Sequence, residues 1–562
     1  MQKLELTWIG KGDEPVVEPR ILLHDASKDY GDPTADNMLI HGDNLLALKA
    51  LVQEFAGRVK CIYIDPPYNT GSAFEHYDDN LEHSIYLRLL SARLSILRTL
   101  LADDGFFCCQ IDDSEGHYVK AILDELFGRS NYLTTFYVQV RYPNKTLAED
   151  SDYQKVIEQV HVYAKQKNLA KLNRPEADYS IEKFKWTVIE KEPGEVVTLG
   201  NKKVEIFKPH QYDIVEIEPC LTGLKETWAT GSLARVRASA GEFFELYLAE
   251  RKEADGLGCL YKVAGIGEDG LGYRYISGPK KATANKGKFY SGIPLQRLEE
   301  LKVGKSVKYL PVTNFYDFAG GFGNCRLEGG VDFKGGKKPE ALLEMIVRYF
   351  SNPGDLVLDS FLGSGTTAAV AHKMGRRYIG IELGEHCYTH CLPRLKAVVD
   401  GEQGGISKTQ NWQGGGGFKF YELAPTLIVK DAHGQPIIND KYNAQMLVAA
   451  IAKLNGYDYS PDADVFWKQG KSQAGSYIFV TTEYLTAAQL DNISRDLPEY
   501  ERLLICAPAF DIGLGKRYEN INIRKIPQSV LDKCTYGADN YNLNVVNPPE
   551  LDDDEWEDGE DA

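Results

Sequence analysis

The chain has 562 residues, a formal net charge of −17 and ten cysteines. This length exceeds what one hydrophobic core can organise and predicts about three domains. The cysteines form no Cys-x-x-Cys pair, and residues 1–10 contain no basic, apolar signal segment. We therefore expect a protein of the reducing cytoplasm rather than a disulfide-stabilised secreted one. No apolar run is long enough to cross a bilayer, so we expect no membrane partner.

The first predicted elements follow an N-terminal extension of residues 1–35. Residues 38–40 favour a short strand, and residues 45–55 favour a helix with a periodic apolar face. Between them, Asp43 and Asn44 are typical of a helix cap. A contact from Asp43 to the adenine of a cofactor, or to a target base, is the alternative interpretation.

A second predicted strand, residues 59–64, ends at the segment Asp65-Pro66-Pro67-Tyr68. Open α/β sheets bind ligands at the carboxyl ends of their strands, so Asp65 lies where a ligand is expected. The two prolines cannot continue a helix and leave the backbone carbonyls of Asp65 and Pro66 available as acceptors. An ordinary turn with a surface tyrosine is the alternative.

This segment suits the exocyclic amino group of a nucleobase. The amino nitrogen is a poor nucleophile because its lone pair is delocalised into the ring. Hydrogen bonds from its two N–H groups to the Asp65 carboxylate and the Pro66 carbonyl favour pyramidalisation. Tyr68 offers a flat face for a base rotated out of the duplex. The segment therefore predicts chemistry on the amino group of adenine or cytosine.

The middle of the chain concentrates basic residues although the total charge is acidic. Residues 551–562 hold eight acidic side chains, which leaves −9 for the remainder. Residues 280–308 hold eight basic and only two acidic residues, a pattern that favours phosphate contact, with a solvated basic loop as the alternative. The candidates for DNA contact are Lys280, Lys281, Lys286 and Lys288, together with Arg141 and Lys145 after the apolar residues 138–140.

Two further strands are predicted at residues 355–359 and 378–382, separated by a turn and a helix over residues 366–374. The turn contains Gly363 and Gly365, which permit positive φ and a close approach of the backbone to a ligand. This strand–turn–helix unit predicts a cofactor loop.

Glu382 ends the second of these strands nineteen residues after Gly363. This is near the spacing at which an acid meets ribose hydroxyls in nucleotide-binding folds. The glycine pattern, ending in Ala368, also fits an NAD or FAD fingerprint. Asp65 and its neighbours, however, have no role in hydride transfer and a direct one in amino-group methylation.

Together these segments resemble the β group of DNA amino-methyltransferases, and within it the modification subunit of type III restriction systems. The resemblance spans about residues 38–165 and 330–400. It implies S-adenosylmethionine as cofactor and a Rossmann-like sheet with circularly permuted motif order, an inserted α+β target-recognition region and a small C-terminal α/β domain. The segments that carry it are residues 41–44, 63–71, 338–339, 359–367 and 379–382.

The resemblance also implies the site residues. The expected catalytic residues are Asp65, Pro66, Pro67 and Tyr68. The expected cofactor-binding residues are Asp359, Phe361, Gly363, Gly365, Thr366, Glu382, Lys338 and Asp43. Among these, Glu382 is expected to hold the ribose and Lys338 to meet the cofactor carboxylate. A solvated lysine before the predicted helix 341–350 is the alternative for Lys338.

The expected reaction is direct methyl transfer to adenine N6 in duplex DNA, with cytosine N4 as the alternative. The catalytic loop contains no cysteine nucleophile of the kind that C5-cytosine methylation requires. Expected partners are duplex DNA, a second copy of the chain and a restriction helicase or nuclease subunit. Two rival hypotheses are a DNA-recognition and assembly subunit that needs a partner for activity, and an RNA amino-methyltransferase.

The expected division of the chain follows from these motifs and from composition. His386 and His390 share a helix face, but no second ligand group lies at zinc-site spacing, so we expect no metal. The expected parts are an N-terminal extension (1–35), the catalytic half (36–170), the target-recognition insertion (171–325), the cofactor half (326–403), a glycine-rich linker (404–417), a C-terminal α/β interaction domain (418–548) and an acidic, disordered tail (549–562).

Overall fold

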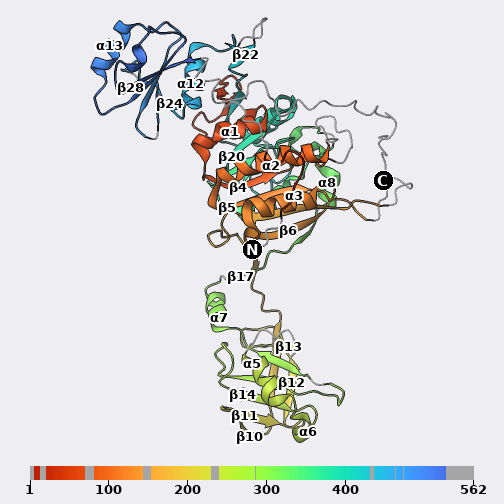
Figure 1. Ribbon diagram of the computed structural model, residues 1–562. Coiled ribbons are helices and arrows are strands. Elements are labelled where there is room, and N and C mark those ends of the chain that lie inside the picture. Colours follow the sequence, from red (N-terminus) through yellow and green to blue (C-terminus); the bar gives the residue numbers. More distant parts are fainter. Residues whose placement is uncertain are drawn as a thin grey trace, which may run out of the picture. The chain divides into compact units, whose positions relative to one another are not determined.

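The computed structural model describes residues 5–12, 20–69, 82–143, 153–228, 239–284, 286–304, 306–333, 335–430, 436–462, 464–472 and 474–526. The chain forms two compact units, which Figure 1 shows. Unit 1 combines Met1–Asn173 with Thr313–Ala562, and unit 2 is the intervening segment Arg174–Val312.

Unit 1 is organised around an eleven-stranded sheet. Its strands are β1 (Leu22–His24), β2 (Tyr30–Gly31), β3 (Met38–His41), β4 (Val59–Ile64), β5 (Leu101–Ile111), β6 (Tyr132–Gln139), β7 (Ile157–Ala164), β18 (Phe315–Asp317), β19 (Leu356–Asp359), β20 (Arg377–Glu382) and β21 (Gly417–Leu423). The order is β1-β21-β3-β20-β19-β4-β5-β7-β6-β18, with β2 paired to β21. The strands from β21 to β5 are parallel neighbours, whereas β7 runs antiparallel to both β5 and β6.

Helices pack on both faces of this sheet, as a mostly parallel sheet requires. The helices of this part of unit 1 are α1 (Asn44–Phe55), α2 (His83–Leu100), α3 (Gly116–Leu123), α8 (Ala319–Asn324), α9 (Glu340–Phe350), α10 (Thr366–Lys373) and α11 (Leu392–Val399), with shorter helical turns η1 (Asp124–Gly128), η2 (Arg129–Asn131), η4 (Cys325–Gly330) and η5 (Cys387–Cys391). Phe107 of β5 joins the apolar cluster formed with α1, α2 and α3. Its neighbour Phe106 points to the opposite face, where its ring centroid lies 4.8 Å from that of Phe350 in α9.

The parallel core confirms the predicted α/β fold class. Strand β4 spans the predicted residues 59–64, and β3, β19, β20, α1, α9 and α10 begin and end within one residue of their predicted bounds. Asp43 caps α1 as predicted, because its Oδ1 accepts a hydrogen bond from the Leu46 backbone N–H at 3.0 Å. The elements around the motifs are thus encoded locally.

The glycine-rich segment before β21 differs from the predicted flexible linker. Gly414, Gly415 and Gly416 have φ of 95°, 106° and 72°, and they turn the chain back into the large sheet, where β21 pairs with β3. Phe418 and Phe420 alternate into the core with 1% and 0% exposure. Strand β21 therefore belongs to the large sheet, although the prediction assigned it to the C-terminal domain.

Beyond β21, unit 1 carries a five-stranded sheet of order β24-β25-β26-β27-β28, in which β26, β27 and β28 are parallel. Helix α13 begins with a capping box between Thr486 and Gln489. The elements are β22 (Ile428–Lys430), β23 (Pro436–Ile438), α12 (Ala444–Leu454), β24 (Asp458–Tyr459), β25 (Gly470–Lys471), β26 (Tyr477–Val480), α13 (Ala487–Asp496), β27 (Leu503–Ala507), η6 (Leu514–Lys516) and β28 (Ile521–Lys525). This is a small α/β arrangement, as the sequence predicts.

Unit 2 is built on an eight-stranded antiparallel sheet of order β10-β11-β14-β15-β16-β13-β9-β12. Its elements are β8 (Glu176–Asp178), β9 (Phe184–Glu190), β10 (Glu195–Leu199), β11 (Lys202–Phe207), β12 (Tyr212–Glu216), β13 (Leu224–Trp228), α5 (Ser239–Phe243), η3 (Phe244–Leu248), α6 (Lys252–Asp255), β14 (Leu260–Ala264), β15 (Tyr273–Ser277), β16 (Lys288–Ser291), α7 (Leu295–Lys302) and β17 (Val307–Tyr309). Phe243 and Phe244 pack on Ile206 and Phe289 of the sheet. Unit 2 lies within the segment 171–325 that the sequence marks as an insertion.

Candidate active site

Three neighbouring strands of unit 1 bring acidic residues to one edge of the sheet. Strand β4 ends immediately before Asp65, β19 ends at Asp359, and β20 ends at Glu382. These strands are adjacent in the order β20-β19-β4 and run parallel. Because the carboxyl ends of parallel strands share an edge, the two motifs that are far apart in the sequence meet there.

The Asp65 carboxylate lies between a phenol and an ammonium group. Its Oδ1 accepts a hydrogen bond from the Tyr68 hydroxyl at 2.8 Å, and its Oδ2 lies 2.7 Å from Lys338 Nζ. Lys338 Nζ is also 5.1 Å from the centroid of the Tyr68 ring, a cation–π distance. The Pro67 carbonyl accepts a hydrogen bond from the Tyr86 hydroxyl of α2 at 2.9 Å. The loop is therefore fixed at its start, its middle and its end.

Glu158 of β7 is a member of this cluster that the sequence prediction missed. Its Oε2 lies 2.8 Å from the Tyr68 hydroxyl and 3.8 Å from Lys338 Nζ. The Gln110 amide also donates to it, and Gln110 Oε1 accepts a hydrogen bond from the Tyr63 hydroxyl at 2.7 Å. An isolated acid in a strand carries no recognisable motif. Only the antiparallel pairing of β7 with β5 and β6 brings Glu158 to the loop.

Burial sets the protonation of these groups. Burial raises the pKa of Asp65, and the charge of Glu158 adds to this, so that together they outweigh the opposing effect of Lys338. Burial alone would lower the pKa of Lys338, but the charges of Asp65 and Glu158 leave it raised. The pKa of Tyr68 is well above its ordinary value, chiefly because of burial. Tyr68 is therefore a protonated donor and Lys338 a cation.

The glycine turn after β19 is held by the acid at the end of β20. The Gly363 backbone N–H donates to Glu382 Oε2 at 2.7 Å. Gly363 and Gly365 have φ of 56° and 82°, in the left-handed region that favours glycine. Thr366 is the first residue of α10 and is buried. Gly363, Gly365 and Thr366 thus form one continuous turn that Glu382 holds from the neighbouring strand.

The buried carboxyl of Asp359 fixes the start of the same turn. It accepts hydrogen bonds from the Phe361 backbone N–H at 2.9 Å and from the Thr367 hydroxyl at 2.6 Å. Phe361 itself packs into the apolar cluster of α1, α2 and α3. Burial raises the pKa of Asp359 to about 7, although both hydrogen bonds oppose this shift. Asp359 is therefore only partly ionised near neutral pH.

Replacing Asp359 should change the pH dependence of stability. The pKa of Asp359 is raised from 3.8 to about 7 in the folded chain, so between these values the folded state binds more protons than the unfolded state. Stability then falls as pH rises through this window. The Asp359→Asn variant has no carboxyl group to titrate, so its stability does not fall for this reason. We expect the Tm difference, variant minus wild type, to increase by about 5 °C between pH 4 and pH 7. Parallel Tm curves in calorimetric scans would contradict the assignment.

A buried network of ion pairs and hydrogen bonds contacts the glycine turn. Arg394 of α11 donates to the Thr366 hydroxyl at 2.7 Å and to the Ser364 carbonyl at 3.2 Å. Its other terminal nitrogen lies 2.8 Å from Glu340 Oε1 at the start of α9, and Lys373 Nζ of α10 lies 2.7 Å from Glu340 Oε2. Arg394 and Glu340 are fully buried. The network joins three helices to the turn, and no motif in the sequence marks it.

Asp43 and Asn44 begin α1, and Asn44 contacts the start of the turn. Besides capping α1, Asp43 Oδ2 lies 3.3 Å from a terminal nitrogen of the buried Arg93. The Asn44 side-chain amide donates to the Ser360 carbonyl at 2.7 Å. The capping interpretation of Asp43 is observed, and a contact from Asp43 to a cofactor stays a prediction.

Comparison with known proteins identifies the family. The family model described as DNA methylase, for N6 and N4 amino-methyltransferases, matches residues 59–391. This match covers more than half of the chain and includes Asp65, the glycine turn and Glu382. The chain belongs to the N6/N4 DNA methylase family. The predicted resemblance is therefore confirmed.

Two curated proteins of the type III restriction-modification class are similar to the chain. The "Probable type III restriction-modification enzyme HindVI Mod subunit" of Haemophilus influenzae is 36% identical over 420 residues, which cover 71% of this chain and 55% of that protein. The EcoPI Mod subunit of Escherichia phage P1, also named as a type III restriction-modification enzyme, is 27% identical over 443 residues, covering 66% and 61%. The chain spans a little over half the length of these relatives. Among solved structures, the cytosine-N4-specific PvuII DNA methyltransferase is 14% identical, with a TM-score of 0.32 and coverage of 71% of this chain and 95% of that one.

The predicted DNA-contact residues differ in their surroundings. In unit 2, Lys280, Lys281 and Lys286 are exposed. Lys288 instead lies 2.5 Å from Glu226 and 4.6 Å from the Trp228 ring centroid, so an acid offsets its charge. Phosphate contact is therefore better supported for the three exposed lysines than for Lys288.

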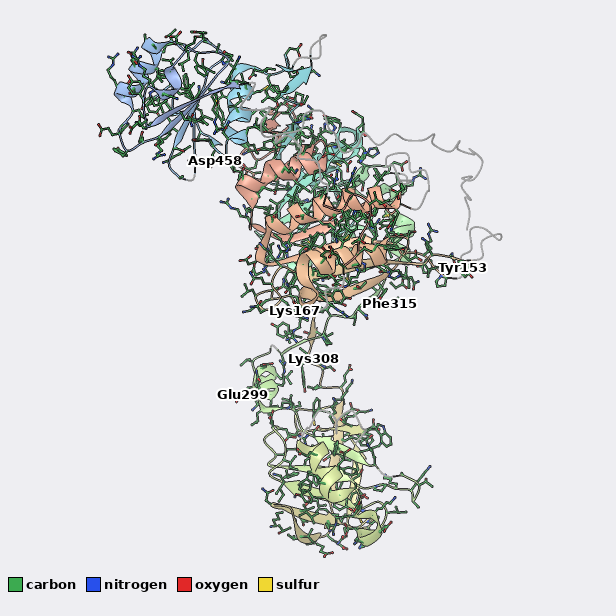
Figure 2. The ribbon with its side chains drawn as sticks, in the orientation of Figure 1. Tyr153, Lys167, Glu299, Lys308, Phe315 and Asp458 are labelled. Atoms are coloured by element: carbon green, nitrogen blue, oxygen red, sulfur yellow. The ribbon has the colours of Figure 1, made fainter. Side chains whose placement is uncertain are left out.

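Three further basic residues belong to the segments for which DNA contact is predicted. Arg141 of unit 1 is exposed, and Lys145 lies outside the described residues. Lys308, labelled in Figure 2, belongs to the same basic segment and is exposed on β17 of unit 2. The DNA-contact role of all these residues stays a prediction.

His386 has an acidic neighbour rather than a metal-site partner. Its Nε2 lies 2.9 Å from Glu382 Oε1. Across the described residues, no group of three or more His, Cys, Asp or Glu side chains could hold a metal ion. Within the same residues, no helix combines the length and apolarity that a membrane crossing needs.

Proposed function

We propose that the chain is an S-adenosylmethionine-dependent DNA methyltransferase that methylates adenine N6 in duplex DNA, as the cytoplasmic modification component of a restriction-modification or phage-defence system. The observation that carries this proposal is the partly buried Asp65 carboxylate beside Tyr68 and Lys338, directly after the strand adjacent to the one that leads into the glycine turn. Family membership supports the substrate class, and the relatives named as Mod subunits support the system.

The residues at the turn fit S-adenosylmethionine. Gly363 and Gly365 combine positive φ with the absence of a Cβ, so a ligand can approach their backbone closely. The buried Ser360 hydroxyl has no hydrogen-bond partner among the described residues, and a ligand atom would satisfy it. Glu382 ends β20 where ribose hydroxyls are expected. When bound, the cofactor supplies a methyl group activated by a sulfonium.

The residues of the catalytic loop have distinct roles in this proposal. The Asp65 carboxylate and the Pro66 carbonyl accept hydrogen bonds from the amino group of the target base, which concentrates the nitrogen lone pair toward the methyl donor. Tyr68 stacks on the base that leaves the duplex. The burial that raises the pKa of Asp65 also suits it to accept the proton that the nitrogen loses after transfer.

The surrounding parts supply recognition and assembly in the same proposal. Unit 2 provides target recognition, with phosphate contacts from Lys280, Lys281 and Lys286, and Arg141 helps to fix the flipped base or its strand. A second copy of the chain and a restriction helicase or nuclease subunit are the proposed protein partners, with the C-terminal α/β domain as the contact. In the rival hypothesis, the chain is chiefly a recognition and assembly subunit that is active only with its partner.

The test is methyl incorporation from labelled S-adenosylmethionine into unmethylated genomic DNA, followed by nucleoside analysis. N6-methyladenine at one sequence motif is the expected result. N4-methylcytosine would reassign the target base. Label that appears only after a restriction subunit is added would favour the rival hypothesis, and label in RNA but not in duplex DNA would overturn the substrate class.

Gly363→Val should prevent cofactor binding. Valine at φ of 56° is strained, and its side chain would lie at the turn that the cofactor must approach. We expect the affinity for S-adenosylmethionine, measured by calorimetry, to fall by about a hundredfold or more. Gly375→Val is the matched control, because Gly375 also has positive φ (71°) but follows α10 in open space. Equal losses in both variants would show that strain alone is responsible.

A further inference from the structure

The hydroxyl of Tyr68 has two carboxylates within hydrogen-bond distance. Its oxygen lies 2.8 Å from Asp65 Oδ1 and 2.8 Å from Glu158 Oε2. A phenol carries one proton and donates to one acceptor at a time. Burial keeps the Tyr68 hydroxyl protonated. The hydroxyl therefore donates to one of the two carboxylates, and the other is available as an alternative acceptor.

Glu158 is held by rigid parts of the sheet, whereas Tyr68 belongs to a loop. Strand β7 is paired on both sides, with β5 and β6. The Gln110 side-chain amide of β5 donates to Glu158, and Gln110 is itself held by the Tyr63 hydroxyl of β4 at 2.7 Å. Gln110 and Tyr63 are almost completely buried. The Glu158 carboxylate is therefore a fixed point against which the loop is positioned.

A target amino group that binds Asp65 has to share this carboxylate with Tyr68 and Lys338. In the proposed function, on which this inference rests, Asp65 must accept a hydrogen bond from the amino group of the target base. That bond competes with the Tyr68 hydroxyl for the Asp65 carboxylate, whose Oδ2 already lies 2.7 Å from Lys338. Glu158 gives the hydroxyl a second acceptor, which holds the ring when the hydrogen bond to Asp65 is weakened.

We propose that Glu158 is a positioning residue of the catalytic loop, which holds the Tyr68 hydroxyl, and with it the stacking face of the ring, while Asp65 binds the target amino group. The ammonium of Lys338 lies on the same ring, 5.1 Å from its centroid. Glu158 and Lys338 thus constrain the phenol at its hydroxyl and at its ring.

A double-mutant cycle with Tyr68 tests this role. Glu158→Ala should lower the single-turnover methylation rate by about tenfold to a hundredfold, the effect of losing a hydrogen bond to a charged acceptor. The KM for S-adenosylmethionine should not change. Glu158→Gln, which keeps a carbonyl acceptor, should restore most of the rate. In a Tyr68→Phe background, Glu158→Ala should cost less than about twofold, because the contact is already absent.

Two outcomes of the cycle would overturn the proposal. One is an equal loss from Glu158→Ala with and without the Tyr68 hydroxyl, which would mean that Glu158 acts through another group, such as Lys338. The other is an increase in the KM for S-adenosylmethionine at unchanged turnover. Glu483→Ala is the matched control, because Glu483 is an exposed glutamate of the C-terminal region and should leave both parameters at wild-type values.

Hydrogen exchange tests the same contact without activity. In the full chain without DNA, Glu158→Ala should speed exchange of the backbone amides of Tyr68 and Asn69, while Glu483→Ala should not. Unchanged exchange would overturn the positioning role. Absence of methyl transfer by the wild-type protein would contradict the proposed function instead, and the exchange experiment would still decide whether Glu158 holds the loop.

Discussion

Asp65→Ala is expected to abolish methyl transfer while leaving cofactor and DNA binding close to wild type. In the proposed function, the carboxylate accepts the hydrogen bond and then the proton of the target nitrogen, and Lys338 and Tyr68 both contact it in the structure. Loss of such a group should lower the single-turnover rate by about 10³-fold or more. Measured rates at saturating S-adenosylmethionine and DNA test this directly.

Two further variants separate chemistry from folding at this position. Asp65→Asn keeps the shape of the side chain and one acceptor oxygen, so it should remain folded. It loses the charge opposite the buried Lys338, so it should still lose most of the methylation rate. Asp496→Ala removes an exposed aspartate of α13 and should have no effect. Turnover by Asp65→Ala within tenfold of wild type would remove Asp65 from the mechanism.

The sequence predicted those parts of the site that depend on local signals. The apolar run of β4 bounded by two prolines identified the end of a buried strand, and hence the position of Asp65 at the sheet edge. The same logic located Glu382 at the end of β20, and the glycines at 363 and 365 identified a turn that requires positive φ. Each of these features is specified by fewer than ten consecutive residues.

The contacts that support the site could not be predicted in this way. Glu158 reaches Tyr68 only through the pairing of β7 with β5 and β6, and strand register over such separations is not visible in one sequence. Lys338 was identified as a site residue, and its Nζ lies 2.7 Å from Asp65 Oδ2, a contact that the sequence did not predict. The predicted contact from Lys338 to the cofactor carboxylate stays a prediction. The glycine run before β21 was interpreted as a linker, because glycine is equally frequent in flexible segments and in tight turns that lead the chain back into a sheet.

Arg394 illustrates how much of the glycine turn depends on such unpredicted contacts. Its guanidinium joins Thr366 and Ser364 of the turn to Glu340 of α9, and Glu340 also holds Lys373 of α10. Glu340 keeps a lowered pKa despite its burial, because the charges of Arg394 and Lys373 outweigh the desolvation. The network is therefore ionised, and removing one member leaves a buried charge without its full compensation.

Arg394→Ala is accordingly expected to destabilise unit 1 by about 3–5 kcal/mol and to weaken S-adenosylmethionine binding in the fraction that remains folded. Denaturant unfolding and calorimetry at low temperature measure the two effects. Glu340→Ala should be similarly destabilising, and the double variant should cost less than the sum, because both changes break one interaction. Arg495→Ala, in the exposed part of α13, should stay within about 0.5 kcal/mol of wild type. Strictly additive losses from Arg394→Ala and Glu340→Ala would show that the two side chains do not act as one support for the turn.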